Sequence, residues 1–175
     1  MKLKNKVAIV TGGGKGIGEE ISLGLAKEGA KVVVADLDKE NSSNVVKEIT
    51  KNSGDAIYVE TDVSKEVSVK KLISETINKF HQIDILINNA GIRHVKKLEK
   101  HDLNDWNDMI SVNLTGPYIC CQAVIPEMKK IGKGKIINFG SIASFMGRPD
   151  RVGYVAAKSG ILGLTRALAI DLKGT

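Results

Sequence analysis

The chain has 175 residues, of which 42% are hydrophobic and 26% are charged, the composition of an ordinary folded domain. Its apolar runs are much shorter than the ~18 residues that a membrane-spanning helix needs, so we expect no membrane association. The net charge of +6 is spread over the whole length, beside only three Phe, three Tyr and one Trp. This distribution favours a solvated lysine-rich surface over a nucleic-acid-binding face, and we expect no nucleic-acid partner.

The two cysteines, Cys120 and Cys121, are adjacent, and a disulfide between neighbouring residues is strained and rare. This pattern does not fit a disulfide-stapled secreted domain, and the first residues contain no apolar stretch typical of a signal peptide. We therefore expect a cytoplasmic protein in which both cysteines are packing residues within a helix rather than nucleophiles.

Five short runs rich in β-branched residues alternate along the chain with five segments of helical spacing. The predicted strands cover 6–11, 31–36, 55–60, 83–88 and 135–140. The predicted helices cover 16–28, 39–51, 64–80, about 103–128 and 152–172. Continuous apolar runs are typical of strands that are buried on both faces.

This strict alternation predicts an α/β fold in which a doubly wound parallel sheet of the Rossmann type carries helices on both faces. Because crossovers are right-handed, we expect the first strand at the centre, strands two and three on one side, and strands four and five on the other. No linker, repeat or low-complexity segment divides the chain, so a single domain over residues 1–175 is expected.

Chemically suggestive residues directly follow the predicted strands. These positions are Thr11-Gly12, Asp36, Asp62-Val63, Asn88-Asn89-Ala90-Gly91 and Ser141. In an open parallel sheet, ligands bind beyond the carboxyl ends of the strands, at the point where the strand order reverses. The sequence therefore predicts a ligand site at this edge of the sheet.

The first strand leads into a glycine-rich loop that contains Gly12, Gly14, Gly16 and Gly18. A Walker phosphate loop is excluded because Lys15 is followed by glycine instead of serine or threonine. The spacing Gly-x-x-x-Gly-x-Gly, over 12–18, suits a tight turn, close approach of a pyrophosphate, and close packing of the next helix. We therefore expect the amino end of that helix to face the phosphates of a dinucleotide.

Asp36 ends the second predicted strand, where a carboxylate can accept hydrogen bonds from both hydroxyls of an adenosine ribose. The same carboxylate would repel the 2′-phosphate of NADP, whereas the ammonium of Lys15 would attract it. We give Asp36 more weight because its place at a strand end is fixed, and we therefore expect NAD, with NADP as the less favoured alternative.

Tyr154 and Lys158 are four residues apart in the last predicted helix and therefore share one face. An ammonium beside a phenol stabilises the phenolate, which would make the tyrosine a general acid or base for a carbonyl or an alcohol. Ser141 lies just after the fifth strand, where its hydroxyl could hydrogen-bond the reacting oxygen.

Taken together, these motifs resemble those of the short-chain dehydrogenase/reductase family over essentially the whole chain. The resemblance rests on Thr11-Gly-x-x-x-Gly-Ile-Gly18, Asn88-Asn89-Ala90-Gly91, Asn113 within Ser111-Val-Asn-Leu114, Ser141, and Tyr154-x-x-x-Lys158. It implies a nicotinamide-dependent oxidoreductase that acts on a secondary alcohol or a carbonyl compound. It also implies a homotetramer or homodimer assembled through the helices at about 103–128 and 152–172.

The resemblance further implies a role for each matched residue. Tyr154 would transfer the proton, Lys158 would hold the nicotinamide ribose, and Ser141 would polarise the substrate oxygen, while Asn113 would hold a relay water. Asp62 would bond the adenine amino group, and Val63 would supply a backbone contact. The implied cofactor-binding residues are Gly12, Gly14, Lys15, Gly16, Ile17, Gly18, Asp36, Asp62, Val63, Asn89, Ala90, Gly91, Tyr154 and Lys158.

Members of that family are usually longer, so we expect the last strands of the family fold to be missing from these 175 residues. Two other functions therefore stay open. One is a catalytically impaired fragment or a nucleotide-binding module without turnover, and the other is a methyltransferase, which also uses a glycine-rich first loop. The methyltransferase is disfavoured because it has no use for Ser141, Tyr154 and Lys158 together.

The remaining candidate residues carry weaker signals. His81, His94 and His101 lack metal-ligand spacing, so no metal site is expected. Trp106 and Met109 are expected to be packing residues. Four basic residues flank the expected site and could meet an anionic substrate, although solvated loop charges are the simpler interpretation: Arg93, His94, Arg148 and Arg151.

Overall fold

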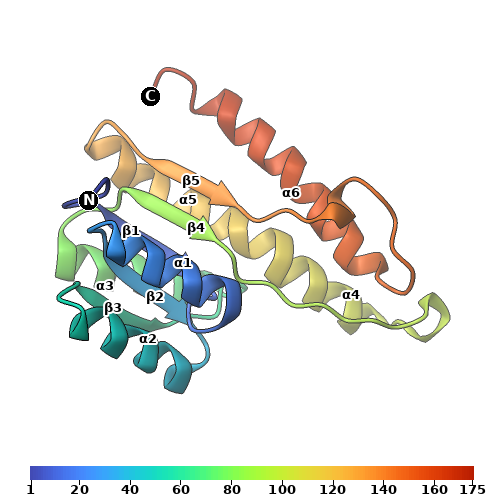
Figure 1. Ribbon diagram of the computed structural model, residues 1–175. Helices are drawn as coiled ribbons and strands as arrows, with labels where there is room; N and C mark the ends of the chain where they lie inside the picture. The colour runs from blue at the N-terminus through green and yellow to red at the C-terminus, as the bar shows by residue number, and fades with distance from the viewer.

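Five parallel strands form one sheet in the computed structural model, which describes residues 1–175 (Figure 1). The strands are β1 (Val7–Thr11), β2 (Lys31–Asp36), β3 (Ala56–Glu60), β4 (Ile85–Asn88) and β5 (Lys135–Asn138). Their order is β3-β2-β1-β4-β5, which confirms the doubly wound topology expected from the sequence. In this order β1 lies at the centre, and the strand order reverses between β1 and β4.

Six α-helices connect the strands and cover both faces of the sheet. They are α1 (Gly16–Lys27), α2 (Lys39–Lys51), α3 (Glu66–Phe80), α4 (Leu103–Ile110), α5 (Gly116–Lys130) and α6 (Val152–Asp171). None of these helices combines the length and the apolar composition needed to cross a membrane.

Two hydrophobic cores lie on opposite faces of the sheet, because successive side chains of a strand point to opposite sides. Val7 and Ile9 of β1 pack in one core with side chains of α3 and α5. Ala8 and Val10 pack in the other core with side chains of α1 and α2. All five residues of β1 are buried, which explains why their run in the sequence is continuously apolar instead of alternating.

The helix expected over about 103–128 is interrupted, and this prediction was wrong in detail. A π-helical turn, Ser111–Thr115, separates α4 from α5. Pro117 has no N–H, so the carbonyl of Asn113 lacks the partner that an α-helix would give it four residues later. The wider turn accommodates this gap, and every other predicted boundary agrees with the structure to within two residues.

Asp84 anchors the amino edge of the sheet, opposite the expected ligand site. Its buried carboxylate accepts hydrogen bonds from the backbone N–H of Val7 at 2.9 Å, from Lys6 Nζ at 2.7 Å and from Gln82 Nε2 at 2.6 Å. Burial opposes ionisation, but the bonds from Lys6, Val7 and Gln82 outweigh it and hold the pKa of Asp84 below its ordinary value.

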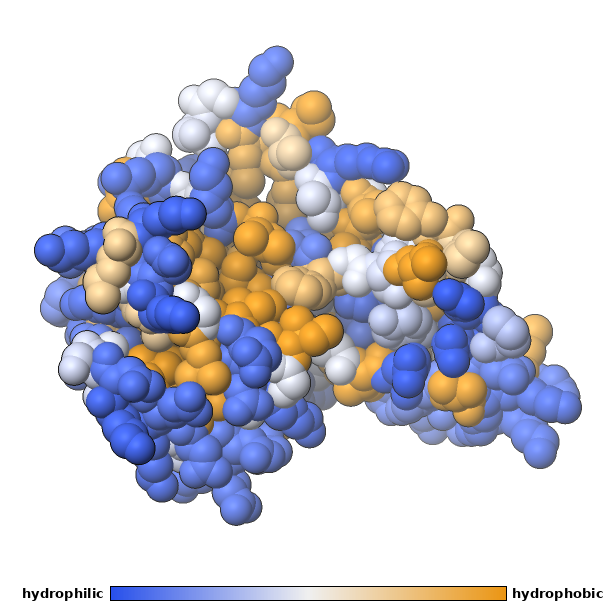
Figure 2. Space-filling model, in the orientation of Figure 1, coloured by the Kyte–Doolittle hydropathy of each residue, from blue (hydrophilic) through white to orange (hydrophobic).

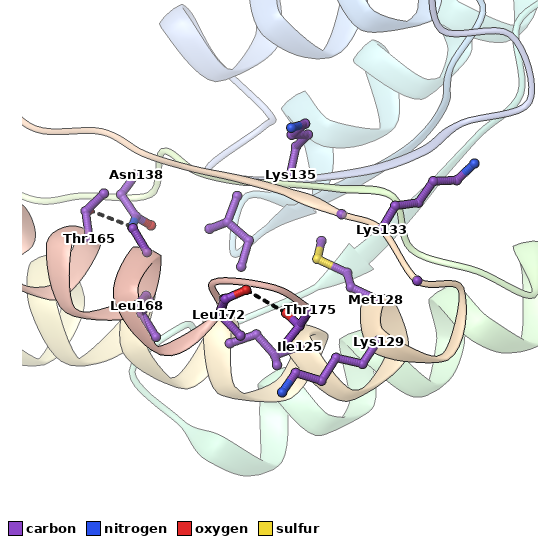
Figure 3. A pocket seen from close by; sticks show the side chains of 14 residues that line it. Ile125, Met128, Lys129, Lys133, Lys135, Asn138, Thr165, Leu168, Leu172 and Thr175 are labelled. Atoms are coloured by element: carbon purple, nitrogen blue, oxygen red, sulfur yellow. Dashed lines mark hydrogen bonds between the residues drawn. The ribbon is translucent and has the colours of Figure 1, made fainter.

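The edge strand β5 has a neighbour on one side only, β4. Ile137 in this strand is 49% exposed. Figure 2, which has the orientation of Figure 1, shows apolar side chains gathered near the middle of this face of the molecule. A groove lies between β5, the end of α5 and α6, where Asn138 Nδ2 donates to Thr165 Oγ1 at 2.9 Å (Figure 3). None of the expected cofactor or catalytic residues lines this groove.

Candidate functional site

The candidate site lies at the carboxyl edge of the sheet. Thr11, at the end of β1, pairs in register with Ala35 of β2 and with Asn88 of β4. Because the strands are parallel, the loops after β1, β2 and β4 therefore start side by side (Figure 1). This arrangement brings together the glycine loop, Asp36 and the segment that follows Asn88, as the sequence predicts.

The glycine loop adopts a backbone that only glycine fits at its key positions. Gly12 and Gly16 have φ values of +63° and +56°, in the left-handed region. A Cβ on Gly12 would lie 2.9 Å from Ala90 Cα, and a Cβ on Gly18 would overlap the carbonyl oxygen of Gly12. A Cβ on Gly16 would meet nothing within 4 Å, so this side of the loop is open.

The amino end of α1 is free to bind an anion. The residue before the helix, Lys15, makes no side-chain cap, and it is exposed together with Gly16 and Ile17. The first N–H groups of a helix have no partner within the helix and carry a partial positive charge. The open loop and the uncapped helix therefore form a cradle that fits a diphosphate.

Asp36 joins the glycine loop to β2. Its carboxylate accepts a hydrogen bond from the Gly14 N–H at 3.0 Å and another from the Asp38 N–H at 3.1 Å. Asp38 caps α2, because its carboxylate accepts hydrogen bonds from the side chain and the backbone N–H of Asn41. These two bonds from Asn41, with a smaller effect from the nearby Lys15, lower the pKa of Asp38. Two carboxylates therefore lie at this corner of the site, and the ammonium of Lys15 lies near Asp38.

The segment after β4 is tied to the glycine loop by Thr11 and Asn89. The hydroxyl of Thr11 accepts hydrogen bonds from the backbone N–H groups of Asn89 and Ala90, both at 3.1 Å. The side-chain amide of Asn89 donates to the carbonyls of Thr11, at 3.1 Å, and Gly12, at 3.0 Å. These bonds use the donors of Asn89 within the protein and fix the two loops against each other.

Asn113 lies in the π-helical turn and is completely buried. Its amide donates to the carbonyls of Ile92 and Met109, both at 3.0 Å, and its oxygen accepts from the Ile92 N–H at 3.2 Å. A Cβ on Gly91 would lie 2.8 Å from this oxygen, so the glycine allows the approach. The side chain of Asn113 therefore holds the loop after β4.

Lys158 and Tyr154 lie on one face of α6, as their spacing predicts. Lys158 Nζ is 6.0 Å from the centre of the Tyr154 ring and donates to the carbonyl of Phe139 at 2.7 Å. Burial lowers the pKa of Lys158. Ser141 lies three residues after the end of β5, and its hydroxyl accepts a hydrogen bond from the Ala143 N–H at 3.1 Å.

The structure places Asp62 and Val63 in the loop that follows β3. Asp62 Oδ1 accepts from the N–H of Ser64 at 2.9 Å and from its hydroxyl at 2.6 Å. Val63 is buried against the start of α5, where a Cβ on Gly116 would lie 2.9 Å from it. Both side chains thus have structural partners within the protein.

Of the residues that were expected to pack, Met109 is buried beneath Gly153 of α6. The expectation was wrong for Trp106, which is 39% exposed because part of its face of α4 has no neighbour within the chain. Burial raises the pKa of the Cys120 thiol to about 12 and that of the Cys121 thiol to about 11, so both thiols stay protonated.

One residue that sequence reasoning missed is Ser144, whose buried hydroxyl joins Ser141 to α6. The only sequence signal is the Ser-x-x-Ser spacing of 141–144, which is compatible with a capping box at the start of a helical turn.

Comparison with known proteins gives a consistent result. The model of a family described as short chain dehydrogenase matches residues 6–175. An uncharacterized oxidoreductase of Thermotoga maritima is 42% identical over 170 residues, which cover 97% of this chain and 66% of the relative. A 3-oxoacyl-(acyl-carrier-protein) reductase of Synechocystis is 43% identical over 171 residues, covering 97% and 69%.

A crystal structure described as a candidate short-chain alcohol dehydrogenase from Sinorhizobium meliloti has the same fold, with a TM-score of 0.93 and 35% sequence identity. The match covers 97% of this chain and 68% of that one. The chain therefore spans about two thirds of the length of the relatives that it matches.

Proposed function

Because the chain belongs to the short-chain dehydrogenase family, we propose that it is the cofactor-binding and catalytic part of a nicotinamide-dependent oxidoreductase. The reaction transfers a hydride between the cofactor and a secondary alcohol or its carbonyl counterpart. The observation that carries this proposal is the placement of Lys158 Nζ beside the Tyr154 ring and against the carbonyl of Phe139, two residues before Ser141 in the chain.

The residues at the carboxyl edge fit a dinucleotide. The diphosphate would be held by the loop of Gly12 and Gly16 and by the amino end of α1, where a Cβ would fill or strain the cradle. Asp36 would hold the adenosine ribose, Asp62 and Val63 would hold the adenine, and the segment Asn89–Gly91 would line the cofactor site. The nicotinamide supplies the hydride chemistry when it is bound.

The preferred cofactor is NAD. Asp36 and Asp38 bring two carboxylates to the corner where the adenosine ribose binds, while Lys15 supplies one ammonium. A 2′-phosphate would be repelled by the two carboxylates, and the single flexible lysine does not offset them.

The catalytic roles are those that membership of the short-chain dehydrogenase family implies for these side chains. Tyr154 gives a proton to the carbonyl oxygen or takes it from the alcohol. The buried Lys158, whose Nζ lies 6.0 Å from the centre of the Tyr154 ring, holds the nicotinamide ribose. Ser141 donates a hydrogen bond to the reacting oxygen. The backbone carbonyl of Asn113, which has no α-helical N–H partner because residue 117 is proline, holds a relay water.

An anionic substrate suits the two loops that border Ser141 and Tyr154. These loops join where the Lys96 N–H donates to the carbonyl of Asp150 at 2.8 Å. Among their basic residues, Lys96 and His94 have an acidic partner, Asp105. The others are Arg93, Lys97, Lys100, Arg148 and Arg151. A 3-oxoacyl thioester or a small hydroxy acid therefore fits better than a neutral sugar.

The proposed assembly is a cytoplasmic homotetramer or homodimer formed through α4, α5 and α6. The exposed apolar residues of these helices support this surface, including Leu103, Trp106 and Ile170.

The first experiment is a calorimetric titration of the 175-residue chain with NADH and separately with NADPH. We expect NADH to bind more tightly. Turnover is then followed by NADH absorbance with a 3-oxoacyl thioester, a small 3-oxo acid and a neutral ketone as probes, in that expected order of rate. Failure to bind either nucleotide would contradict the proposal, and binding without turnover of any probe would indicate a nucleotide-binding module.

A further inference from the structure

The segment from Phe139 to Ser144, which carries Ser141, is attached to α6 at both ends through one residue, Lys158. At the first end, Lys158 Nζ donates to the carbonyl of Phe139 at 2.7 Å. At the other end, the hydroxyl of Ser144 donates to the backbone carbonyl of Lys158 at 2.6 Å. Ser141 lies between these two attachments.

The hydroxyl of Ser144 has a second bond, and this bond reaches Ser141 itself. It accepts the backbone N–H of Ser141 at 3.0 Å, while the Ser144 N–H donates to the Ser141 carbonyl at 2.9 Å. Ser144 is buried, so no water replaces these bonds without opening the segment. One hydroxyl thus connects the backbone of Ser141 to the backbone of Lys158.

We propose that Ser144 is a positioning residue that sets the Ser141 hydroxyl relative to Lys158 and Tyr154. The inference rests on the proposed function, in which Ser141 and Tyr154 act on the substrate oxygen and Lys158 holds the nicotinamide ribose. The ammonium of Lys158 can exchange Phe139 for another acceptor, but its backbone carbonyl cannot move away from α6. The Ser144 bond is therefore the attachment that persists whatever the lysine ammonium binds.

The first test needs no cofactor or substrate. Amide hydrogen exchange is measured by NMR for the Ser144→Ala variant and for Ser159→Ala as a matched control. Ser159 contacts the same residue, but its bond to the Ser144 carbonyl is 3.5 Å long and lies near the surface. We expect the Ser141 amide to exchange about tenfold faster in Ser144→Ala and to be unchanged in Ser159→Ala. An unchanged Ser141 amide in Ser144→Ala would overturn the proposal.

The second test is a double-mutant cycle on turnover of a 3-oxoacyl thioester with NADH. We expect Ser141→Ala to lower kcat about 10²–10³-fold, as loss of one donor to a reacting oxygen does. Ser144→Ala should lower kcat by at least about tenfold, and the double variant should be no slower than Ser141→Ala. Multiplying effects of the two substitutions would contradict a shared role.

The two tests separate the inference from the proposed function. If Ser141→Ala leaves kcat unchanged, the proposed role of Ser141 is wrong, and Ser144 then has no catalytic side chain to position. If Ser141→Ala is slow but Ser144→Ala keeps the wild-type kcat, only the present inference fails. Should Ser144→Ala not fold, Ser144→Cys keeps the shape with a weaker donor, and it should lie between wild type and Ser141→Ala in kcat.

Discussion

Thr11 and Asn89 are joined by two hydrogen bonds, one to the side chain and one to the backbone of Thr11. The hydroxyl of Thr11 accepts the backbone N–H of Asn89 at 3.1 Å, and the side-chain amide of Asn89 donates back to the carbonyl of Thr11 at 3.1 Å. Since β1 and β4 are neighbours in the sheet, this pair joins the glycine loop to the segment after β4. These two bonds therefore hold the two loops of the cradle against each other at the carboxyl edge.

Replacing Thr11 with valine tests this reciprocal pair. The variant keeps the shape of the side chain but leaves the N–H groups of Asn89 and Ala90 without their acceptor. We expect the free energy of unfolding, measured in urea, to fall by about 1–3 kcal/mol. Thr50→Val, which removes an exposed helical hydroxyl, is the control and should change the stability by less than about 0.5 kcal/mol.

Gly18 and Gly24 both lie in α1 and make a matched pair for the close approach of the glycine loop. A Cβ on Gly18 would overlap the carbonyl oxygen of Gly12, whereas a Cβ on Gly24 would meet nothing within 4 Å. We expect Gly18→Ala to weaken NADH binding at least about tenfold in calorimetry. Gly24→Ala should raise the unfolding free energy by up to about 1 kcal/mol, because alanine favours a helix, and should leave binding unchanged.

The charge of Asp36 should control the choice of cofactor. Asp36→Asn keeps an oxygen for the Gly14 N–H and removes the negative charge. NADPH affinity should rise about tenfold relative to NADH affinity in the same titrations. Glu40→Gln removes an exposed charge from the first turn of α2 and should leave this ratio unchanged. An equal ratio in Asp36→Asn and wild type would refute the assignment of Asp36.

Replacing Tyr154 with phenylalanine removes only the phenolic hydroxyl. We expect kcat for a 3-oxoacyl thioester to fall about 10²–10⁴-fold, the usual contribution of a general acid, while NADH affinity stays within about twofold of wild type. Tyr118→Phe is the control, since the Tyr118 hydroxyl lies on the surface and accepts from Gln122. A loss of NADH binding in Tyr154→Phe would instead indicate a structural role.

Asp84 makes the stability of the protein depend on pH in the acid range. Its pKa is lower in the folded protein than in the unfolded chain, so its carboxylate stabilises the fold above the unfolded value of ~3.9. This contribution disappears as the pH falls through the lower folded value. Asp84→Asn should therefore cost about 1–3 kcal/mol at pH 7 and progressively less below pH ~4, as measured by urea unfolding. A pH-independent difference would contradict this role.

The sequence predicted the strand order because the right-handed crossover rule leaves few alternatives once strands and helices alternate. It also predicted which residues meet at one edge, since Asp36 and Asn88 end parallel strands. Burial explains this success, because β1 and β4 are so completely enclosed that their apolar runs are continuous.

The π-helical turn at Asn113 was not predictable from hydrophobic spacing, because apolar periodicity does not record which backbone groups lack partners. Pro117 is the relevant signal, but a proline in the first turn of a helix is common. The hydrogen bonds of Ser144 could not be predicted from the sequence for a different reason. They join residues 141, 144 and 158 across two elements, and such contacts depend on how α6 packs against the segment after β5.

The two buried thiols give the protein a built-in reporter of its own opening. Cys120 and Cys121 are the only cysteines in the chain, and both lie on the buried face of α5, in the core. A thiol-reactive dye can label them only when this core is exposed, because burial both blocks access and keeps the sulfur protonated. The rate of labelling therefore measures how often native molecules open, without any engineered probe.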